Sequence, residues 1–294
     1  MNKPQIIGIG ISGLVGSRIT QILEYKFEFI PFGISNGVDI TKPETLKKLS
    51  DYPNADFVLH LAAKADVDGC EKDKNQEEHG EAWKVNVLGT KNVAEACMEA
   101  GKKIIYISTD FVFDGEKKQG EIYSEEDAPN PTNWYGFTKY EGEVEVDESG
   151  VDYLILRLAY PFRAEYEPKK DFVRFIKSRL EDGIETKIVT DHIFCPTFID
   201  DFAIAIGKLL TLDASGVCHV VGGESITPYD ASILIADAFG LDKSLISKTT
   251  REEFFSNRAP RPFNLALSNA KIEKLGVKMK GFEESLQVIK SQLQ

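Results

Sequence analysis

The stretch Gly8-Ile9-Gly10-Ile11-Ser12-Gly13-Leu14-Val15-Gly16 decides the fold of this 294-residue chain. It contains Gly-x-Gly-x-x-Gly at positions 8, 10 and 13, and Gly-x-x-Gly-x-x-Gly at positions 10, 13 and 16. An apolar run over residues 5–10 leads into the loop, and helical periodicity follows over residues 14–24. Glycines let the backbone turn sharply and approach a pyrophosphate, whose charge the N-terminus of the next helix stabilises. The stretch therefore predicts a dinucleotide-binding loop between a first strand and a first helix.

Strand and helix patterns alternate through the first half of the chain. Short apolar runs stand at residues 28–32, 57–62, 103–108 and 153–158, and the longest helical pattern covers residues 83–100. Thr41 and Glu44 have the spacing of a capping box, which predicts a helix with Thr41 as its N-cap. Alternation of this kind, with strands rich in Ile, Val and Leu, predicts an α/β fold with a doubly wound parallel sheet of the Rossmann type. We expect residues 1–157 to form the dinucleotide-binding domain.

The second half has a looser pattern. Helical segments are predicted at residues 172–180, 202–212, 231–239 and 282–293, with short apolar strands between them. We expect residues 158–294 to form a smaller C-terminal, substrate-binding lobe. The chain could also return to the first domain around residues 198–210, so this boundary stays open.

Composition limits the classes of partner and the compartment. A formal net charge of −12 and a pI near 5.0 argue against nucleic acid or an anionic membrane as the main partner. No apolar run approaches the ~20 residues that span a bilayer. The four cysteines lack C-x-x-C spacing and the four histidines lack metal-ligand spacing. We therefore expect reduced thiols in a cytoplasmic protein, and no metal site.

A second group of polar residues follows the run at 103–108. Ser108-Thr109-Asp110 comes directly after this predicted strand, and Tyr135 and Lys139 lie four residues apart on a predicted helix. A phenol has an unperturbed pKa near ~10, and a neighbouring ammonium favours its ionised form. Such a pair is common on solvated helices, but the glycine loop and Thr109 favour proton transfer to or from a sugar or alcohol oxygen.

These features together resemble the extended short-chain dehydrogenase/reductases, and within them the dTDP-4-dehydrorhamnose reductase (RmlD-like) family. The resemblance spans nearly the whole chain and is carried by Ser-Thr-Asp-Phe-Val-Phe-Asp-Gly at 108–115, Tyr135-Gly-x-x-Lys139 with Glu-Gly-Glu at 141–143, Asp191 with Pro196-Thr197, and Ala-Pro-Arg-Pro at 259–262. It implies an NAD(P)H-dependent reductase of a nucleotide-linked 4-keto-6-deoxy sugar. Thr109 would then bind the substrate carbonyl, Tyr135 would donate the proton, and Lys139 would lower the Tyr135 pKa and hold the nicotinamide ribose.

The cofactor residues follow from the loop and the resemblance together. They are Gly10, Ile11, Ser12, Gly13, Leu14, Val15 and Gly16 in the loop, then Asp39, Ile40, Leu61, Ala62, Ala63, Lys64, Asn86, Tyr135 and Lys139. The end of the second strand, Pro31-Phe32-Gly33, carries neither an acidic residue nor an arginine. NADPH and NADH both stay open, with NADPH slightly preferred. Asp39 is expected near the adenine, or else is a loop residue before a helix.

Substrate contacts are expected at Thr109, Asp110, Tyr160 and Arg261. Four positions depart from the family pattern: Lys64 and Phe111 replace Tyr, Tyr160 replaces Trp, and Asp171 replaces Asn. An Asp171 carboxylate near a diphosphate would repel it. The expected partner is a nucleotide sugar, without nucleic acid or membrane, and a homodimer stays open.

Other functions remain open on the same residues. An epimerase keeps the same Tyr and Lys, whereas 4,6-dehydratases place an Asp-Glu pair after the Thr, and here Phe111 takes the second position. Members of this family also serve as regulatory subunits of methionine adenosyltransferase, which is a non-catalytic alternative. Intact Thr109, Tyr135 and Lys139 favour an enzyme.

Overall fold

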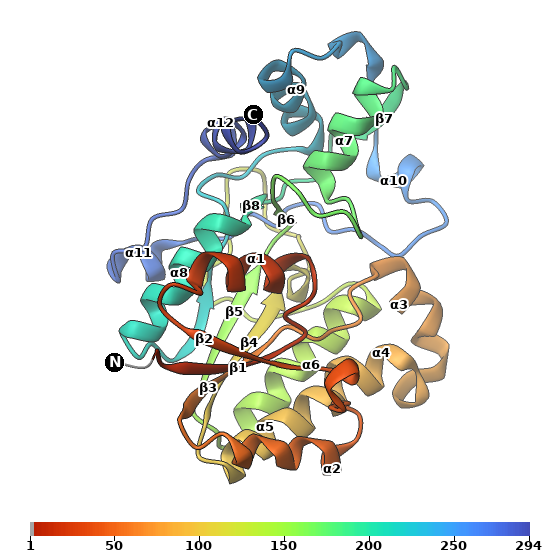
Figure 1. Ribbon diagram of the computed structural model, residues 1–294. Coiled ribbons are helices and arrows are strands. Elements are labelled where there is room, and N and C mark those ends of the chain that lie inside the picture. The colour runs from red at the N-terminus through yellow and green to blue at the C-terminus, as the bar shows by residue number, and fades with distance from the viewer. Residues whose placement is uncertain (1–2) are drawn as a thin grey trace.

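The computed structural model describes residues 3–294. Its centre is a six-stranded, all-parallel sheet with the order β2-β1-β3-β4-β5-β9. The strands are β1 (Gln5–Ile9), β2 (Glu28–Phe32), β3 (Ala55–His60), β4 (Lys103–Thr109), β5 (Tyr153–Leu158) and β9 (Gly216–His219). Helices cover both faces of the sheet (Figure 1). The predicted doubly wound α/β fold is therefore confirmed.

Each face of the sheet has its own apolar core. On one face α1 (Leu14–Leu23) packs against α8 (Ile199–Thr211), and their core includes Ile19, Phe202 and Ile206. On the other face lie α2 (Pro43–Leu46), α5 (Gly89–Glu99) and α6 (Trp134–Glu148). The strands contact apolar side chains on both sides, which explains why they read as nearly continuous apolar runs.

The glycine loop lies where the strand order reverses. From β1 the chain goes to β2 on one side and then crosses to β3 on the other. Gly10 has φ of +78°, and a Cβ there would lie 2.7 Å from the backbone nitrogen of Ala62. Only glycine fits this left-handed turn against the segment after β3. A ligand crevice is expected at such a reversal point, next to the carboxyl ends of the strands.

A smaller lobe lies at one end of the sheet, at the top of Figure 1. It contains α7 (Phe172–Glu181), α9 (Pro228–Phe239) and α12 (Phe282–Gln292), which enclose a separate core with Phe162, Phe194 and Phe282. Its short parallel strand pairs are β6 (Pro161–Phe162) with β8 (Thr197–Phe198), and β7 (Thr186–Val189) with β10 (Ile246–Thr249). The remaining helices are α3 (Val67–Asp73), α4 (Glu81–Trp83), α10 (Arg251–Phe254) and α11 (Ala270–Lys274).

The chain returns to the main sheet before it ends. After β8, helix α8 packs on α1, and β9 pairs with β5 through Leu154 to Arg157. Residues 199–219 thus belong with the sheet and not with the smaller lobe. A single division at residue 158 does not follow the sheet.

The helix expected at residues 83–100 is observed, but the expected helix start at Thr41 was wrong. Helix α2 begins at Pro43 with Lys42 as its N-cap and no side-chain capping bond, and the Thr41 hydroxyl instead donates to Asp39 Oδ1 at 2.7 Å. Proline is well suited to the first helical position, which explains the later start. The helix predicted at 83–100 contains a π-helical stretch at Lys84–Leu88 between α4 and α5. Within residues 3–294, no helix combines the length and the apolar character needed to cross a membrane.

Candidate functional site

The site begins at the carboxyl end of β4. Thr109 is the last residue of the strand, and its hydroxyl accepts a hydrogen bond from the Phe111 N–H at 3.3 Å and donates to Asp110 Oδ1 at 3.0 Å. Both Thr109 and Asp110 are buried. These two bonds fix the side chain at the first turn after the strand.

Helix α6 brings Tyr135 to the same turn. Its N-cap, Asn133, accepts a hydrogen bond from the Gly136 N–H at 2.9 Å. A Cβ at position 136 would lie 2.1 Å from the Phe111 carbonyl oxygen, so glycine is required for this close approach. The Tyr135 ring meets the Phe111 ring edge-on, with centroids 5.8 Å apart. Burial raises the pKa of Tyr135, while the nearby Thr109 hydroxyl acts to lower it.

Lys139 lies one helical turn further along α6 and is buried. Its Nζ donates to the Ile107 carbonyl oxygen at 2.8 Å and lies 4.0 Å from the centroid of the Tyr106 ring. Burial lowers the pKa of Lys139 to about 7, and the Glu143 carboxylate acts to raise it. The amine therefore titrates near neutral pH.

Asp110 has an unusual position for a carboxylate. Among the described residues its Oδ2 has no hydrogen-bond partner, and the residue is 1% exposed. Burial raises the pKa of Asp110 to about 7, against the hydrogen bond from Thr109. Its charge acts to raise the pKa of both Tyr135 and Tyr160, and both of these rings pack against the adjacent Phe111.

Tyr160 lies just beyond β5 in a left-handed conformation, with φ of +40°. Its ring packs on Phe111 and Phe194. His192 Nδ1 lies 2.8 Å from the Pro262 carbonyl oxygen, which can only accept, so this nitrogen carries the proton. His192 Nε2 must then accept from the Tyr160 hydroxyl at 3.0 Å. His192 lacks metal-ligand spacing in the sequence, and nothing in its local sequence signals this contact.

Arg261 comes from the C-terminal segment, and its charge acts to lower the pKa of Tyr160. Its guanidinium donates to Asp68 Oδ1 at 2.9 Å and to the Ala259 carbonyl oxygen at 2.7 Å. Asp68 also accepts from the Ala259 N–H, and Asn133 Nδ2 donates to the Pro260 carbonyl oxygen. The segment 259–262 is thereby held across α3 and the start of α6.

The residues around the glycine loop form the other side of the site. Helix α1 starts after Gly13 and, within the described part of the chain, has no side-chain capping bond at its N-terminus. Ser12 is exposed, and Leu61, Ala62 and Ala63 follow β3 beside the loop. Within the described part of the chain, no side chain thus caps the N–H groups of the first helical turn beside this loop.

Asn86 joins the segment after β3 to α6. It lies in the π-helical stretch, where its amide oxygen accepts from the Lys64 N–H at 2.8 Å and its nitrogen donates to Lys64 O and to Thr138 Oγ1. The Lys64 side chain turns away to pair with Glu81. The substitution of Tyr by Lys at position 64 therefore leaves the backbone there fixed by Asn86.

Asp39 and Ile40 lie apart from the catalytic candidates. Asp39 Oδ1 accepts from both the N–H and the hydroxyl of Thr41, and Lys42 lies 3.5 Å from Oδ2. The Thr41 hydroxyl lowers the pKa of Asp39. Ile40 is buried against the α5 side, where its carbonyl accepts from Asn92.

Asp171 does not present a free charge. Its carboxylate caps α7 by accepting the Arg174 N–H at 3.0 Å, and pairs with Arg174 Nε at 2.8 Å. It also accepts from the Arg163 N–H. Arg174 neutralises this carboxylate, which removes the main reason to expect repulsion of a diphosphate, and the effect on a bound diphosphate stays a prediction. The Arg163 guanidinium bonds to residues of α1, at Leu14 O and Ser17 Oγ.

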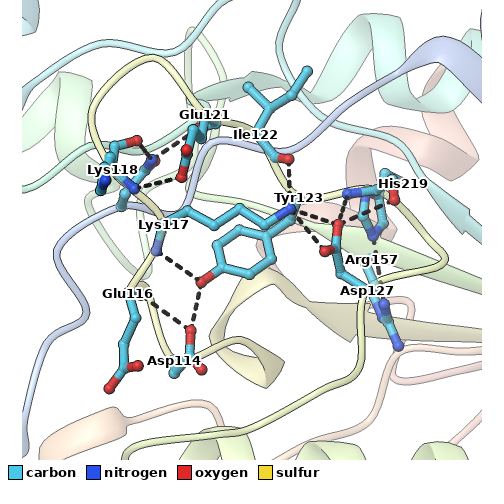
Figure 2. A network of polar contacts seen from close by, with 12 residues as sticks. Asp114, Glu116, Lys117, Lys118, Glu121, Ile122, Tyr123, Asp127, Arg157 and His219 are labelled. Atoms are coloured by element: carbon cyan, nitrogen blue, oxygen red, sulfur yellow. Dashed lines mark hydrogen bonds and ion pairs between the residues drawn. The ribbon is translucent and has the colours of Figure 1, made fainter.

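The loop between Thr109 and α6 is anchored by its own polar network (Figure 2). The Tyr123 hydroxyl donates to Asp114, and Lys117 Nζ donates to Asp127 Oδ2 at 2.7 Å. The Tyr123 ring stacks on Phe113 with centroids 4.3 Å apart. This network holds together the loop that leads from Thr109 into α6.

Comparison with known proteins identifies the family. Residues 4–294 match the family described as the RmlD substrate binding domain. The chain belongs to this family. It is similar to the dTDP-4-dehydrorhamnose reductase of Bacillus anthracis, solved in complex with NADP, at 28% identity and a TM-score of 0.89 over 99% of this chain and 100% of that chain. The resemblance predicted from the sequence is thus confirmed.

Two curated RmlD-like relatives differ in what their names state. "Probable low-salt glycan biosynthesis reductase Agl14" of Haloferax volcanii is 30% identical, and the match covers 96% of each chain. Methionine adenosyltransferase 2 subunit beta of Xenopus tropicalis is 27% identical, over 94% of this chain and 85% of the relative. Membership of the RmlD family is therefore compatible with both reductases and a subunit of another enzyme.

Proposed function

We propose that this protein is an NAD(P)H-dependent reductase of a nucleotide-linked 4-keto-6-deoxy sugar, of the dTDP-4-dehydrorhamnose reductase type. The observation that carries the proposal is that Thr109, Tyr135 and Lys139 gather at the carboxyl end of β4, on the same edge of the parallel sheet as the glycine loop. Thr109 and Tyr135 flank one turn, and Lys139 is the buried cation behind them. A hydroxyl that binds a carbonyl oxygen, a phenol that donates a proton to it and an ammonium next to the phenol are together suited to reducing a carbonyl group.

The residues present fit a dinucleotide. The uncapped N-terminus of α1 offers N–H groups to a pyrophosphate, and the left-handed Gly10 lets the backbone come close. Bound NADPH or NADH would supply the hydride. The residues that would hold it are Gly10 to Gly16 at the pyrophosphate, Asp39 and Ile40 at the adenine, Leu61, Ala62, Ala63, Lys64 and Asn86 along the middle, and Tyr135 and Lys139 at the nicotinamide ribose. A relative solved with NADP supports the slight preference for NADPH.

The chain's own groups would handle the proton. The Thr109 hydroxyl would hold the substrate carbonyl oxygen next to the phenol, and Tyr135 would give its proton to that oxygen as negative charge develops there. A charged Lys139 favours the phenolate that remains, which lowers the barrier to proton transfer. Since the pKa of Lys139 is about 7, reduction should slow as the pH rises through neutrality and the amine loses its charge.

Substrate contacts are proposed at Thr109, Asp110, Tyr160 and Arg261. Asp110 Oδ2, which has no partner among residues 3–294, would accept a hydrogen bond from a sugar hydroxyl. Tyr160 would offer its ring, because its hydroxyl is bonded to His192. Arg261 uses two guanidinium bonds within the protein, so further N–H groups remain for a phosphate oxygen.

The test is oxidation of NADPH or NADH with a panel of nucleotide-linked keto sugars, with NMR of the products. We expect Tyr135→Phe to lower turnover by ~10²–10⁴, the usual contribution of a positioned general acid. Tyr140→Phe, on the same helix, is the matched control and should keep its activity. Full activity in Tyr135→Phe would exclude the mechanism, and a C4 or C5 epimer without net cofactor oxidation would indicate an epimerase.

The alternative is a non-catalytic subunit, supported by the similarity to methionine adenosyltransferase 2 subunit beta. Stable co-purification with a partner enzyme, together with no turnover of any sugar in the panel, would favour it. The retained Thr109, Tyr135 and Lys139 support the reductase.

Four buried, unpaired cysteines fit the reducing cytoplasm that we propose as the compartment. A homodimer stays a prediction.

A further inference from the structure

The Lys139 ammonium is held in a way that its spacing from Tyr135 did not reveal. Its Nζ lies 4.0 Å from the centroid of the Tyr106 ring and donates to Ile107 O. In the described part of the chain, no carboxylate forms an ion pair with it. A cation that lies within ~6 Å of an aromatic centroid is attracted by the ring quadrupole, more strongly when water is excluded.

The Tyr106 ring is itself fixed from three directions. It comes from β4, is fully buried, and packs against the His60 ring of β3 with centroids 5.5 Å apart. On the α6 side, a Cβ at Gly142 would lie 2.5 Å from the Tyr106 hydroxyl, so glycine makes room for it. The hydroxyl donates to Lys139 O at the long distance of 3.4 Å. The ring face is therefore presented to Lys139 by sheet and helix together.

We propose that Tyr106 is a positioning residue, whose ring face holds the Lys139 ammonium in place behind Tyr135 where a carboxylate would otherwise be needed. A carboxylate would neutralise the ammonium, whereas a ring attracts it and leaves the net charge to act on the phenol. Ile107 O takes one of the three ammonium N–H groups, and the ring faces another. One N–H remains for a ligand. The catalytic consequence rests on the proposed function, but the contact itself does not.

Within residues 3–294, none of the other charged or titratable groups around Lys139 neutralises its ammonium, so the Tyr106 ring is its main side-chain partner. Glu143, on α6, acts to raise the pKa of Lys139, but its carboxylate is taken by Arg157 of β5 in a bidentate pair. His60, on β3, is neutral because burial lowers its pKa to about 3. Burial raises the pKa of the Tyr106 and Tyr135 phenols, so both stay neutral.

The experiment weakens the ring quadrupole without changing its shape. Position 106 is changed from Tyr106→Phe through Tyr106→4-fluorophenylalanine to Tyr106→3,4,5-trifluorophenylalanine. The Lys139 titration is followed by NMR of protein labelled with [ε-¹³C]lysine, with its signal assigned by loss in Lys139→Met. We expect the midpoint to fall stepwise, by about one pH unit in all from Tyr106→Phe to the trifluoro variant. Melting curves check that each variant is folded.

Two controls isolate the contact. Phe113→3,4,5-trifluorophenylalanine weakens a ring that faces Arg157 at 5.1 Å and should leave the Lys139 midpoint unchanged. The buried Lys102 amine, which bonds to the carbonyl oxygens of Tyr52 and Ala55, gives a second signal that should not move across the series.

A Lys139 midpoint that stays constant across the position 106 series would overturn the proposal, as would an equal shift in the Phe113 control. The titration needs neither substrate nor cofactor, so its outcome is separate from the reductase assay. If the sugar panel is reduced, the alkaline limb of the kcat/KM pH profile should move to lower pH by the same amount as the titration. A graded titration with no turnover would keep the Tyr106 contact and reject the reductase.

Discussion

Two buried cations of the larger lobe have opposite surroundings. Arg157, on β5, makes a bidentate pair with Glu143, with both side chains at most 5% exposed, and its guanidinium faces the Phe113 ring at 5.1 Å. Lys139, on α6, faces the Tyr106 ring at 4.0 Å and donates to the Ile107 carbonyl oxygen, and no carboxylate of residues 3–294 forms an ion pair with it. The first charge is neutralised and holds helix to strand. The second is left unneutralised, which costs stability and leaves it free to act on the site.

The largest effect is expected from removing the unneutralised cation. Lys139→Met should lower reductase turnover by ~10²–10⁴, because the phenol of Tyr135 then loses the charge that favours its ionised form. The measurement is kcat with the reduced cofactor and the sugar identified by the panel. Lys91→Met, on the neighbouring helix and partly exposed, is the control and should keep its activity. A loss smaller than tenfold in Lys139→Met would contradict the proposed role.

Breaking the neutralised pair should affect stability instead. Glu143→Gln leaves the Arg157 guanidinium buried without its counter-charge, so the free energy of unfolding should fall by about 3–5 kcal/mol. Urea unfolding measures it. Glu145→Gln, which breaks the partly exposed pair with Lys91, should cost less than about 1 kcal/mol. Equal losses in the two variants would mean that burial does not separate these pairs.

The pH dependence of stability distinguishes the two cations further. The pKa of Lys139 is lowered from 10.5 to about 7 by burial, so between these values the unfolded chain binds more protons than the folded one. The destabilisation by Lys139 is therefore complete below about pH 7 and fades as the pH rises toward 10.5. Lys139→Met should be more stable than the wild type near pH 6, with a difference that disappears near pH 10. A difference independent of pH would exclude this explanation.

A third cation, Arg174, is expected to give the smallest effect on stability. Arg174 pairs with Asp171, which also caps α7. Asp171→Ala should lower the free energy of unfolding by about 1–2 kcal/mol through the lost cap, and Asp171→Asn by less, because the amide oxygen still accepts the helix N–H. Thermal or urea unfolding of the two variants checks the order. An equal loss in the two variants would assign the effect to the ion pair instead of the cap.

Much of the fold could be predicted from the sequence, because its strands, helices and glycine loop depend on neighbouring residues. The loop from Gly10 to Gly16, and the apolar runs at Glu28–Phe32 and Tyr153–Leu158, matched the observed elements. The helix start at Thr41 was wrong because Pro43 takes the first helical position and Thr41 bonds to Asp39. The π-helical stretch around Asn86 could not be predicted, since its extra residue is fixed by contacts to Lys64 and Thr138 from other elements.

The candidate site also has a part that the sequence could predict and a part that it could not. Thr109, Tyr135 and Lys139 could be proposed from residue types and spacing, because a strand end and a helical turn have fixed geometries. The bond between Tyr160 and His192 and the pair of Arg261 with Asp68 join residues far apart in sequence. Hydrophobic periodicity and local spacing do not predict such long-range contacts.

The sequence by itself determined a doubly wound α/β fold, a glycine loop after the first strand, and a Tyr and a Lys on one helical face. These depend on backbone conformation and on the period of a strand or a helix, which neighbouring residues set. Only the tertiary structure decided that Arg157 would be neutralised and Lys139 would not. That difference depends on which ring or carboxylate the packing of β3, β4, β5 and α6 brings to each cation.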